Sequence, residues 1–384
     1  MKFESLGSSN GNIDIPLLKI SNKSKNNESK PVICIIGRQH CGETHTSFII
    51  HGFINYLISK EVICHKLRDI FEFWVAPIVN PDGVIIGNYR CNTQGKDMNR
   101  HFFADDDPEG LKLRLTEVEL IRSYLRQYVP TENNQLKLFL DIHAHSAQHS
   151  IFVYAPVDED ANNNNIIKRF PMILDNLSPY FQYDNCKFGN EKYKKNCARL
   201  GVFRDFNLPN SFTIESSCHA YEIKGTDEIE QFKEDHFLKF GEHLVAGIAK
   251  HLGVELTEVD KAMMTHGFDV ELDYGLYMKD QKEHKKQKKR KRDGERKRRR
   301  LNSNAGLRES RESAFRGSGQ SWYSKKQSRL GDRDQDNSSR LSRRNHNSQN
   351  KAHISQTKFE MNPPGFSDEQ QFSTLNNGVV LIMN

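Results

Sequence analysis

Paired-cysteine motifs, leader-like segments and long hydrophobic runs are all missing from this sequence. The seven cysteines are odd in number, and no two of them have C-x-x-C or zinc-finger spacing. This pattern argues against a disulfide framework and favours a reducing compartment. The first residues contain no apolar stretch typical of a signal peptide, and no apolar run reaches the ~18 residues of a membrane span. We therefore expect a cytoplasmic protein with no membrane partner.

Hydrophobic residues are also scarce, at 36% of the 384 residues, which indicates that part of the chain carries no core. Residues 279–384 hold 26 Lys and Arg against 12 Asp and Glu, a net charge of +14, which leaves residues 1–278 at −8. Beyond residue 256 the apolar pattern fades into a Lys/Arg-rich and then a Ser/Asn/Arg-rich stretch, a composition typical of disorder. We expect a folded domain over 1–256 and a mostly disordered basic tail over 257–384.

Apolar segments that alternate with amphipathic ones indicate the fold class. Buried strands are expected at 31–37, 70–79, 136–142, 150–155 and 211–217, and helices at 44–58, 116–129, 166–177 and 227–252. Residues 12–21 are expected to form an edge strand, because Pro16 cannot donate to a central ladder, and residues 198–206 a further strand. Strands alternating with helices predict an α/β fold with a mixed central sheet and helices on both faces.

Three chemically active side chains are expected near the carboxyl ends of strands. His40 and Glu43 follow the 31–37 strand on a tight turn, and His143 follows the 136–142 strand. Alone, an H-x-x-E pair is expected by chance in a chain with 16 His, and a solvated His beside a helix-capping Glu is the simpler interpretation. Two His and one carboxylate, gathered where open α/β sheets hold ligands, match a hydrolytic zinc site with an open fourth position.

A charge in a buried strand and a long polar loop are further candidates for function. Glu215 interrupts the apolar pattern of the 211–217 strand, where a charge is costly unless it is paired or points to water from an edge strand. The loop over 80–100 carries Asn, Asp and Arg side chains. Loops of this length in a compact domain are usually functional or disordered.

Six motifs follow one another in an order that is specific to one family. They are Arg-x-His-x-Gly-Glu-Thr at 38–44, Asn-Pro-Asp-Gly-Val at 80–84, Gly-Asn-Tyr-Arg-Cys at 87–91, Gly-x-Asp-x-Asn-Arg at 95–100, Asp-Ile-His-x-His-Ser at 141–146 and Phe-Thr-Ile-Glu-Ser-Ser at 212–217. This set resembles the zinc carboxypeptidases and, within them, the cytosolic carboxypeptidase branch, which acts on tubulin. The resemblance covers residues 5–252 and implies the zinc carboxypeptidase fold.

The resemblance also implies a role for each matched residue around the metal. One Zn²⁺ per chain would be bound by His40, Glu43 and His143. Asp97 would accept a hydrogen bond from His40 and fix its tautomer. Arg90 would polarise the scissile carbonyl and steady the oxyanion.

On the substrate side, Asn99 and Arg100 would grip the C-terminal carboxylate, a task that suits a bidentate guanidinium. Glu215 would act as the general base. A glutamate side chain would need a further cation, for which Arg199 is the first choice. The alternative for Arg199 is a surface Arg on a strand edge.

This chain departs from the branch at three positions that lie between motif residues. Cys41 stands where the branch has Pro, Met98 where it has Leu and Ala144 where it has Gly. The branch also has a β-sandwich domain before the catalytic one, whereas only residues 1–30 precede the zinc-binding strand here. The substrate-side tyrosine of digestive relatives has three candidates, Tyr183, Tyr193 and Tyr221.

The resemblance implies a zinc metallocarboxypeptidase that removes C-terminal or side-chain-linked glutamate from tubulin or another protein with an acidic tail. The alternatives are a non-catalytic microtubule- or nucleic-acid-binding protein on the same fold, or a zinc deacylase of N-acyl amino acids. Residues 279–300 carry 14 Lys and Arg against 4 Asp and Glu, so the tail is expected to contact acidic tubulin tails, with nucleic acid as a non-specific partner. Residues 285–292 also match a nuclear import signal, and a tail that binds nothing specific is the third interpretation.

Overall fold

The computed structural model describes residues 1–23, 29–129 and 135–255, together with residues 286, 290, 293 and 294. The predicted basic tail and the import signal within it lie outside the described residues apart from those four positions. The division into a folded domain and a disordered tail therefore stays a prediction.

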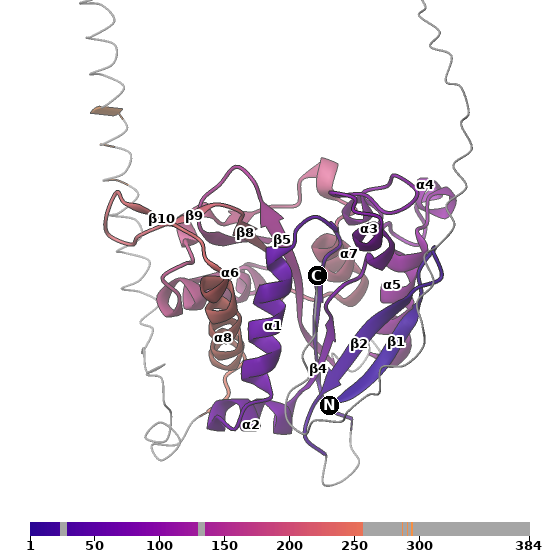
Figure 1. The fold of residues 1–384 in the computed structure, drawn as a ribbon, viewed down its shortest axis with the longest axis horizontal. Coiled ribbons are helices and arrows are strands. Elements are labelled where there is room, and N and C mark those ends of the chain that lie inside the picture. The colour runs from indigo at the N-terminus through magenta and orange to yellow at the C-terminus, as the bar shows by residue number, and fades with distance from the viewer. Residues whose placement is uncertain (24–28, 130–134, 256–285, 287–289, 291–292, 295–384) are drawn as a thin grey trace, which may run out of the picture. The chain divides into compact units, whose positions relative to one another are not determined.

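An eight-stranded sheet forms the centre of the described domain (Figure 1). In spatial order the strands are β1 (Lys2–Ser8), β2 (Asp14–Ile20), β4 (Glu72–Ala76), β3 (Val32–Gly37), β5 (Leu136–His145), β8 (Ser211–Ser217), β6 (Ile151–Ala155) and β7 (Lys187–Phe188). β4, β3, β5 and β8 run parallel to one another, whereas β2 against β4 and β6 against β8 are antiparallel. The prediction of a mixed central sheet is confirmed.

Helices cover both faces of this sheet, also as predicted (Figure 1). One face carries α1 (His45–Leu57), α2 (Val62–Ile70), α6 (Ala161–Leu177) and α8 (Glu234–His251), and the other carries α5 (Thr116–Tyr128) and α7 (Ala198–Phe206). The connections hold α3 (Pro81–Ile85), α4 (Pro108–Lys112), 3-10 turns at Met98–Arg100, Tyr183–Asn185 and Lys192–Lys194, and a separate antiparallel pair of β9 (Ala220–Glu222) and β10 (Ile229–Gln231). No helix in the described ranges is long and apolar enough to cross a membrane.

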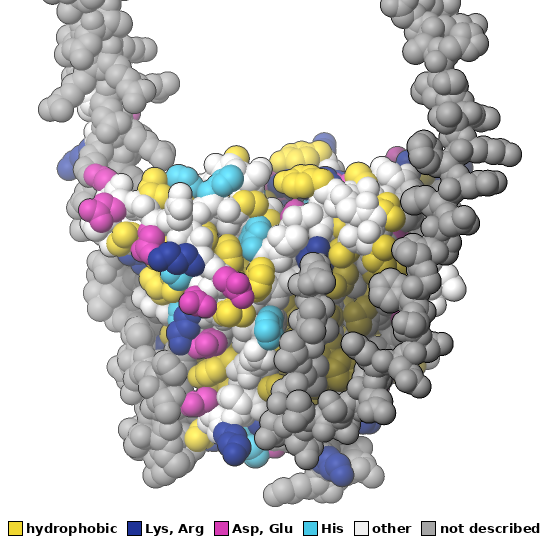
Figure 2. All heavy atoms as spheres, in the orientation of Figure 1, with side chains coloured by type: hydrophobic (Ala, Val, Ile, Leu, Met, Phe, Trp, Pro, Cys, Tyr) yellow, Lys and Arg dark blue, Asp and Glu magenta, His cyan; other side chains and the backbone are white. Residues whose placement is uncertain are grey.

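The side chains of β3 show how the two layers arise. Ile33 and Ile35 belong to the apolar core beneath α1 and α8, whereas Cys34 and Ile36 belong to the core beneath α5 and α7. Successive side chains of a strand point to opposite faces, so a strand that is buried on both faces is apolar throughout. The outer side of α8 carries charged side chains of both signs, as expected for an amphipathic helix, whereas α1 contains no Asp, Glu, Lys or Arg (Figure 2).

α1 and α8 pack closely because each has a glycine at the contact. A Cβ on Gly52 would collide with the backbone of Leu238, and one on Gly241 with the backbone of Ile49. α1 begins directly after the turn that follows β3. The helix pair therefore anchors the turn on which the metal-binding side chains were predicted.

The prediction of an edge strand at 12–21 is wrong. β2 is covered on its outer side by β1, which the sequence analysis did not identify. Pro16 is tolerated because β2 pairs with β4 only over Leu18–Ile20, so no ladder bond to β4 is required at Pro16. On the other side Pro16 pairs with Ser5, next to an irregularity in the register of β1.

The prediction of a strand at 198–206 is also wrong, because these residues form α7. Ala198, Val202 and Phe206 are four residues apart and all pack into the core beneath that helix, the spacing of one helix face rather than of a strand. Asn207 ends the helix with φ 47°, a left-handed conformation that Asn tolerates. The apolar content of this segment favours a strand, but the period of its apolar residues is that of a helix.

Candidate active site

The parallel strands bring the predicted residues to one edge of the sheet. β3, β5 and β8 are neighbours, and their carboxyl ends therefore meet at the same edge. His40 and Glu43 lie on the turn after β3, His143 lies near the end of β5, and Glu215 is the register partner of His143 on β8. Strand pairing thus assembles residues that are far apart in the sequence.

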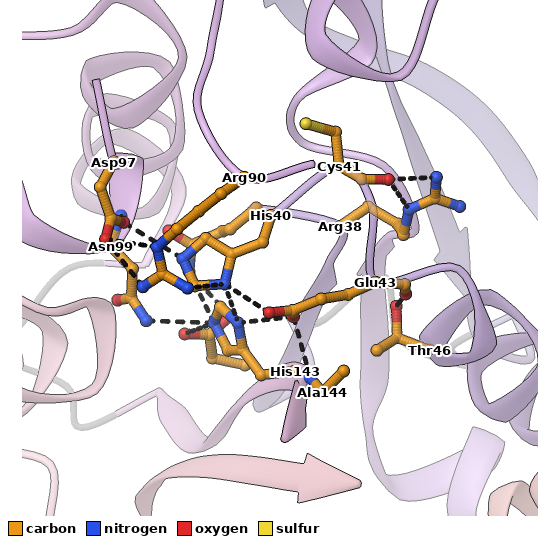
Figure 3. Close-up of polar contacts among 12 residues, drawn as sticks. Arg38, His40, Cys41, Glu43, Thr46, Arg90, Asp97, Asn99, His143 and Ala144 are labelled. Carbon is orange, nitrogen blue, oxygen red and sulfur yellow. Dashed lines mark hydrogen bonds and ion pairs between the residues drawn. The ribbon is translucent and has the colours of Figure 1, made fainter. Parts of the chain in front are cut away.

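His40, Glu43 and His143 offer three ligand atoms within 4.8 Å of one another (Figure 3). His40 Nδ1 lies 2.7 Å from Glu43 Oε1, His143 Nδ1 lies 3.1 Å from Glu43 Oε2, and the two Nδ1 atoms are 3.0 Å apart. All three side chains are buried. Two imidazole nitrogens and a carboxylate that converge on one point are the donor set of a hydrolytic zinc site, so these residues fit Zn²⁺.

The carboxylate of Glu43 is kept in the form that a metal needs. Burial opposes its ionisation, but His143 and His40 outweigh burial and hold the pKa of Glu43 well below its usual range. Its Oε2 also accepts a hydrogen bond of 2.8 Å from the backbone N–H of Ala144. Glu43 is therefore ionised and oriented as a metal ligand has to be.

The turn that carries His40 and Glu43 is shaped by the residues around it. Arg38 has φ 56°, and its guanidinium donates two hydrogen bonds to the carbonyl oxygen of Cys41, at 3.0 and 2.5 Å. Gly42 donates from its N–H to the carbonyl of Tyr89 at 2.7 Å, and a Cβ at Gly42 would lie 2.6 Å from that same oxygen. Only glycine allows this approach of the two loops.

Asp97 lies behind His40, where the sequence analysis expected it. Its Oδ1 is 3.1 Å from His40 Nε2, the ring nitrogen that faces away from Glu43. Its Oδ2 accepts from Arg90, at 2.9 Å from Nε and 2.8 Å from Nη2. Burial opposes ionisation of Asp97, but His40 and Arg90 hold its pKa well below the usual range. One carboxylate thus orients both a metal ligand and the Arg90 guanidinium.

The sequence analysis missed the corresponding partner of the second histidine. Asp141 Oδ2 lies 2.8 Å from His143 Nε2, and Oδ1 accepts a hydrogen bond of 2.7 Å from Gln39 Nε2. Asp141 belongs to the Asp-Ile-His-x-His-Ser motif at 141–146. The signal was its spacing: residues two apart on a strand point to the same face.

A cavity of about 270 Å³ opens beside the cluster. Its walls include four cationic side chains, from Arg90, Arg100, Lys194 and Arg199. The remaining lining residues are His40, Glu43, Asn99, His143, Ala144, His145, Ser146, Tyr154, Cys197, Thr213 and Glu215. Positive walls around a metal-binding cluster favour an anionic ligand.

Glu215 is partly buried in this cavity and is not on an edge strand, because β8 lies between β5 and β6. Burial raises the pKa of Glu215 to about 8, His143 opposes the rise, and the carboxylates of Glu43 and Asp141 add to it. A carboxylate whose pKa lies near neutrality can both accept and return a proton.

Arg199 lies in the first turn of α7 rather than on a strand edge, and it is 3% exposed. Its Nη2 is 3.3 Å from Oε2 of Glu191, and its guanidinium lies 5.6 Å from the ring centroid of Tyr154. Its Nε has no hydrogen-bond partner among the described residues, nor has Oγ1 of Thr213 on the same cavity wall. Buried polar atoms without partners are costly, so these two are suited to a bound ligand.

Arg100 and Asn99, the other residues predicted to bind substrate, differ in how many polar contacts they make within the protein. Arg100 lines the cavity and donates from Nη1 to the carbonyl of Asn99 at 2.7 Å. The Asn99 amide is engaged on both sides, since its Oδ1 accepts from the N–H of Ala198 at 2.8 Å and its Nδ2 lies 3.1 Å from His143 Nε2. Asn99 therefore lies against the ring of His143 in this structure, in addition to facing the cavity.

The three candidate tyrosines are separated by their surroundings. Tyr183 is buried, and Tyr221 is buried with its hydroxyl 2.6 Å from Glu230. Tyr193 is 71% exposed and lies beside Lys194, a residue of the cavity wall. Of the three, Tyr193 has the side chain that is free to approach a substrate.

Comparison with known proteins agrees with this geometry. The family model of the zinc carboxypeptidases matches residues 1–239, more than half of the chain. The chain belongs to the zinc carboxypeptidase family. Cytosolic carboxypeptidase 6 of Mus musculus is 33% identical over 245 residues, which are 63% of this chain and 44% of that protein. Cytosolic carboxypeptidase 3 of Bos taurus is 34% identical over 206 residues, which are 52% of this chain and 20% of that protein. This chain spans less than half the length of these curated relatives.

Solved structures share the fold of this chain. A metallo-carboxypeptidase from Burkholderia cenocepacia superimposes with a TM-score of 0.56 at 22% identity, over 66% of this chain and 64% of that one. Thrombin activatable fibrinolysis inhibitor superimposes with a TM-score of 0.51 at 17% identity, over 66% of this chain and 68% of that one. The predicted carboxypeptidase-like fold is confirmed.

Proposed function

We propose that this chain is a zinc-dependent metallocarboxypeptidase that removes C-terminal or side-chain-linked glutamate from proteins with acidic tails, with tubulin as the first candidate. The observation that supports this proposal is one cavity that holds His40, Glu43 and His143 together with Glu215 and a set of cationic side chains. The names of the cytosolic carboxypeptidase relatives agree with a peptidase of the cytoplasm.

Each residue of the cavity has its own role in the proposed chemistry. His40, Glu43 and His143 would hold Zn²⁺, which supplies a Lewis acid that polarises the scissile carbonyl and makes water more acidic. Glu215 accepts a proton from the attacking water and returns it to the leaving amine. The Arg90 guanidinium, fixed by Asp97, stabilises the negative charge that develops on the carbonyl oxygen.

The cationic walls account for a preference for glutamate. Arg100 faces the terminal carboxylate of the substrate, and Asn99 flanks it. Arg199 and Lys194 lie on the same walls and bind the carboxylate of the terminal side chain. The unpartnered Nε of Arg199 and Oγ1 of Thr213 would then gain hydrogen-bond partners.

We also propose that the basic tail helps the enzyme to meet its acidic substrate. Residues 279–300 are cationic, whereas residues 1–278 carry a net charge of −8. A cationic tether raises the local concentration of an acidic tubulin tail near a body that would otherwise repel it. Truncation after residue 278 should raise KM on microtubules and leave kcat on a short glutamate peptide unchanged. Equal KM values at low salt would exclude the tether and leave nuclear import or a tail without a partner.

The test of the substrate uses polyglutamylated tubulin and the zinc-loaded full chain. Mass spectrometry of the tubulin tails should show progressive loss of glutamate, and the Glu215→Gln variant should show none. If tubulin stays intact while short peptides with a C-terminal glutamate are cleaved, the carboxypeptidase activity is supported but tubulin is not the substrate. Release of acetate from N-acetyl amino acids, with no peptide cleaved, would favour the zinc deacylase.

A further inference from the structure

Asp141 is a buried carboxylate that the proposed chemistry does not use. Its side chain is fully buried on β5, with β3 on one side and β8 on the other, and its register partners there are Ile36 and Thr213. A buried carboxylate is costly unless charged or hydrogen-bonding partners compensate it. No Lys or Arg contacts it within the described part of the chain; its polar neighbours there are His143 and Gln39.

The geometry around His143 mirrors that around His40. Each ring turns its Nδ1 toward Glu43 and its Nε2 toward an aspartate, at 3.1 Å to Asp97 and 2.8 Å to Asp141. The two aspartates differ in their other partners. Asp97 is shared with Arg90 and is partly exposed, whereas Asp141 is held by Gln39 in the core.

We propose that Asp141 is a positioning residue for the metal centre, which fixes the ring of His143 with Nδ1 directed at the metal. A carboxylate behind a metal-binding histidine sets the tautomer and the orientation of the ring and makes the ring a stronger ligand. Gln39 donates to the far oxygen of Asp141 and so holds the carboxylate against His143. The metal centre therefore has a carboxylate behind each of its two histidines.

The experiment compares zinc affinity and zinc-free stability in matched variants. Asp141→Asn removes the charge with little change of shape, and its zinc affinity, measured by competition with a chelator, should fall about 10- to 100-fold. Its zinc-free melting temperature is measured alongside, because removing one partner of a buried pair is destabilising by itself. The control is Asp82→Asn, a buried aspartate that instead accepts from Ser9 and the N–H of Gly11. This control should melt earlier and bind zinc like the wild type.

A purely structural role for Asp141 predicts no change in zinc affinity. Asp141→Asn would then melt earlier without zinc and keep wild-type zinc affinity, which would overturn the proposal. Co²⁺ substitution gives a second readout, since a reoriented His143 changes the visible spectrum of the bound ion. If Asp141→Asn does not fold, the same zinc-affinity measurement is made on Gln39→Met. This variant keeps the Asp141 carboxylate but removes the hydrogen bond that holds it against His143. A loss of zinc affinity in Gln39→Met supports the proposal, and unchanged affinity contradicts it.

Discussion

His143 and Glu215 are register partners on the adjacent parallel strands β5 and β8. A metal ligand and the proposed base are therefore fixed side by side by the ladder of the sheet and not by loops. Strand spacing of ~4.8 Å keeps the two side chains within reach of one substrate atom. Sites built on strands hold their geometry better than sites built on loops.

The base is tested by Glu215→Gln. Glutamine keeps the shape of the side chain but cannot accept a proton, so turnover should fall by several orders of magnitude at wild-type zinc content. Single-turnover kinetics and metal analysis of the same preparation check both parts. A variant that kept a substantial fraction of the wild-type rate would show that another group is the base.

The raised pKa of Glu215 predicts how the stability of the zinc-free protein depends on pH. The folded chain keeps this proton up to a pH of about 8, whereas the unfolded chain releases it near 4.5. Between these values the unfolded state binds fewer protons, so the contribution of Glu215 to stability falls as pH rises. The melting temperature of the wild type should drop relative to that of Glu215→Gln over this range. A difference between the two melting temperatures that does not change with pH would contradict the raised pKa of Glu215.

Zinc should bind with a stoichiometry of one per chain. Binding to the folded state alone stabilises it by about 2.7 kcal/mol at 100 times the dissociation constant, so zinc should raise the melting temperature. A chelator should reverse the effect. In His143→Ala the response to zinc should be lost at the same metal concentration. A wild type without bound metal after reconstitution would exclude the centre.

Arg199 is tested by its effect on selectivity. Arg199→Gln should lower kcat/KM about 10- to 100-fold on peptides with a C-terminal glutamate, because a charged hydrogen bond to the side chain is lost. Peptides with a C-terminal alanine should be affected much less. Arg204→Gln on the same helix is the control, since Arg204 is not part of the cavity wall. An equal loss on both peptides would assign Arg199 a structural role.

The sequence predicted the local elements better than their neighbours in space. β3 was predictable because it is continuously apolar, and β5 because it is largely apolar over residues 136–142. The covering of β2 by β1 was not, because β1 is largely exposed and lacks the apolar pattern of a strand, although Asn10-Gly11 in the connection is a strong turn signal. α7 was predicted as a strand because the helix is only nine residues long, and Arg199 and Gly201 interrupt its apolar pattern.

The site followed the same rule. The metal-binding residues were predictable because their motifs carry the chemistry in the residue types themselves. Asp141 was not assigned, because its role depends on which ring nitrogen of His143 faces the metal, and the sequence does not show that. The second contact of Asn99, to the backbone of Ala198, joins two loops that are distant in the chain. Such contacts are visible only in the folded protein.

The most direct test of the account is the cleavage of a short peptide that ends in several glutamates. The zinc-loaded full chain is incubated with this peptide, and with a copy whose C-terminal carboxylate is amidated, and mass spectrometry follows both. The account predicts stepwise release of glutamate from the free C-terminus, none from the amidated peptide, and none with Glu215→Gln. Intact free peptide in the presence of bound zinc would contradict the proposed activity.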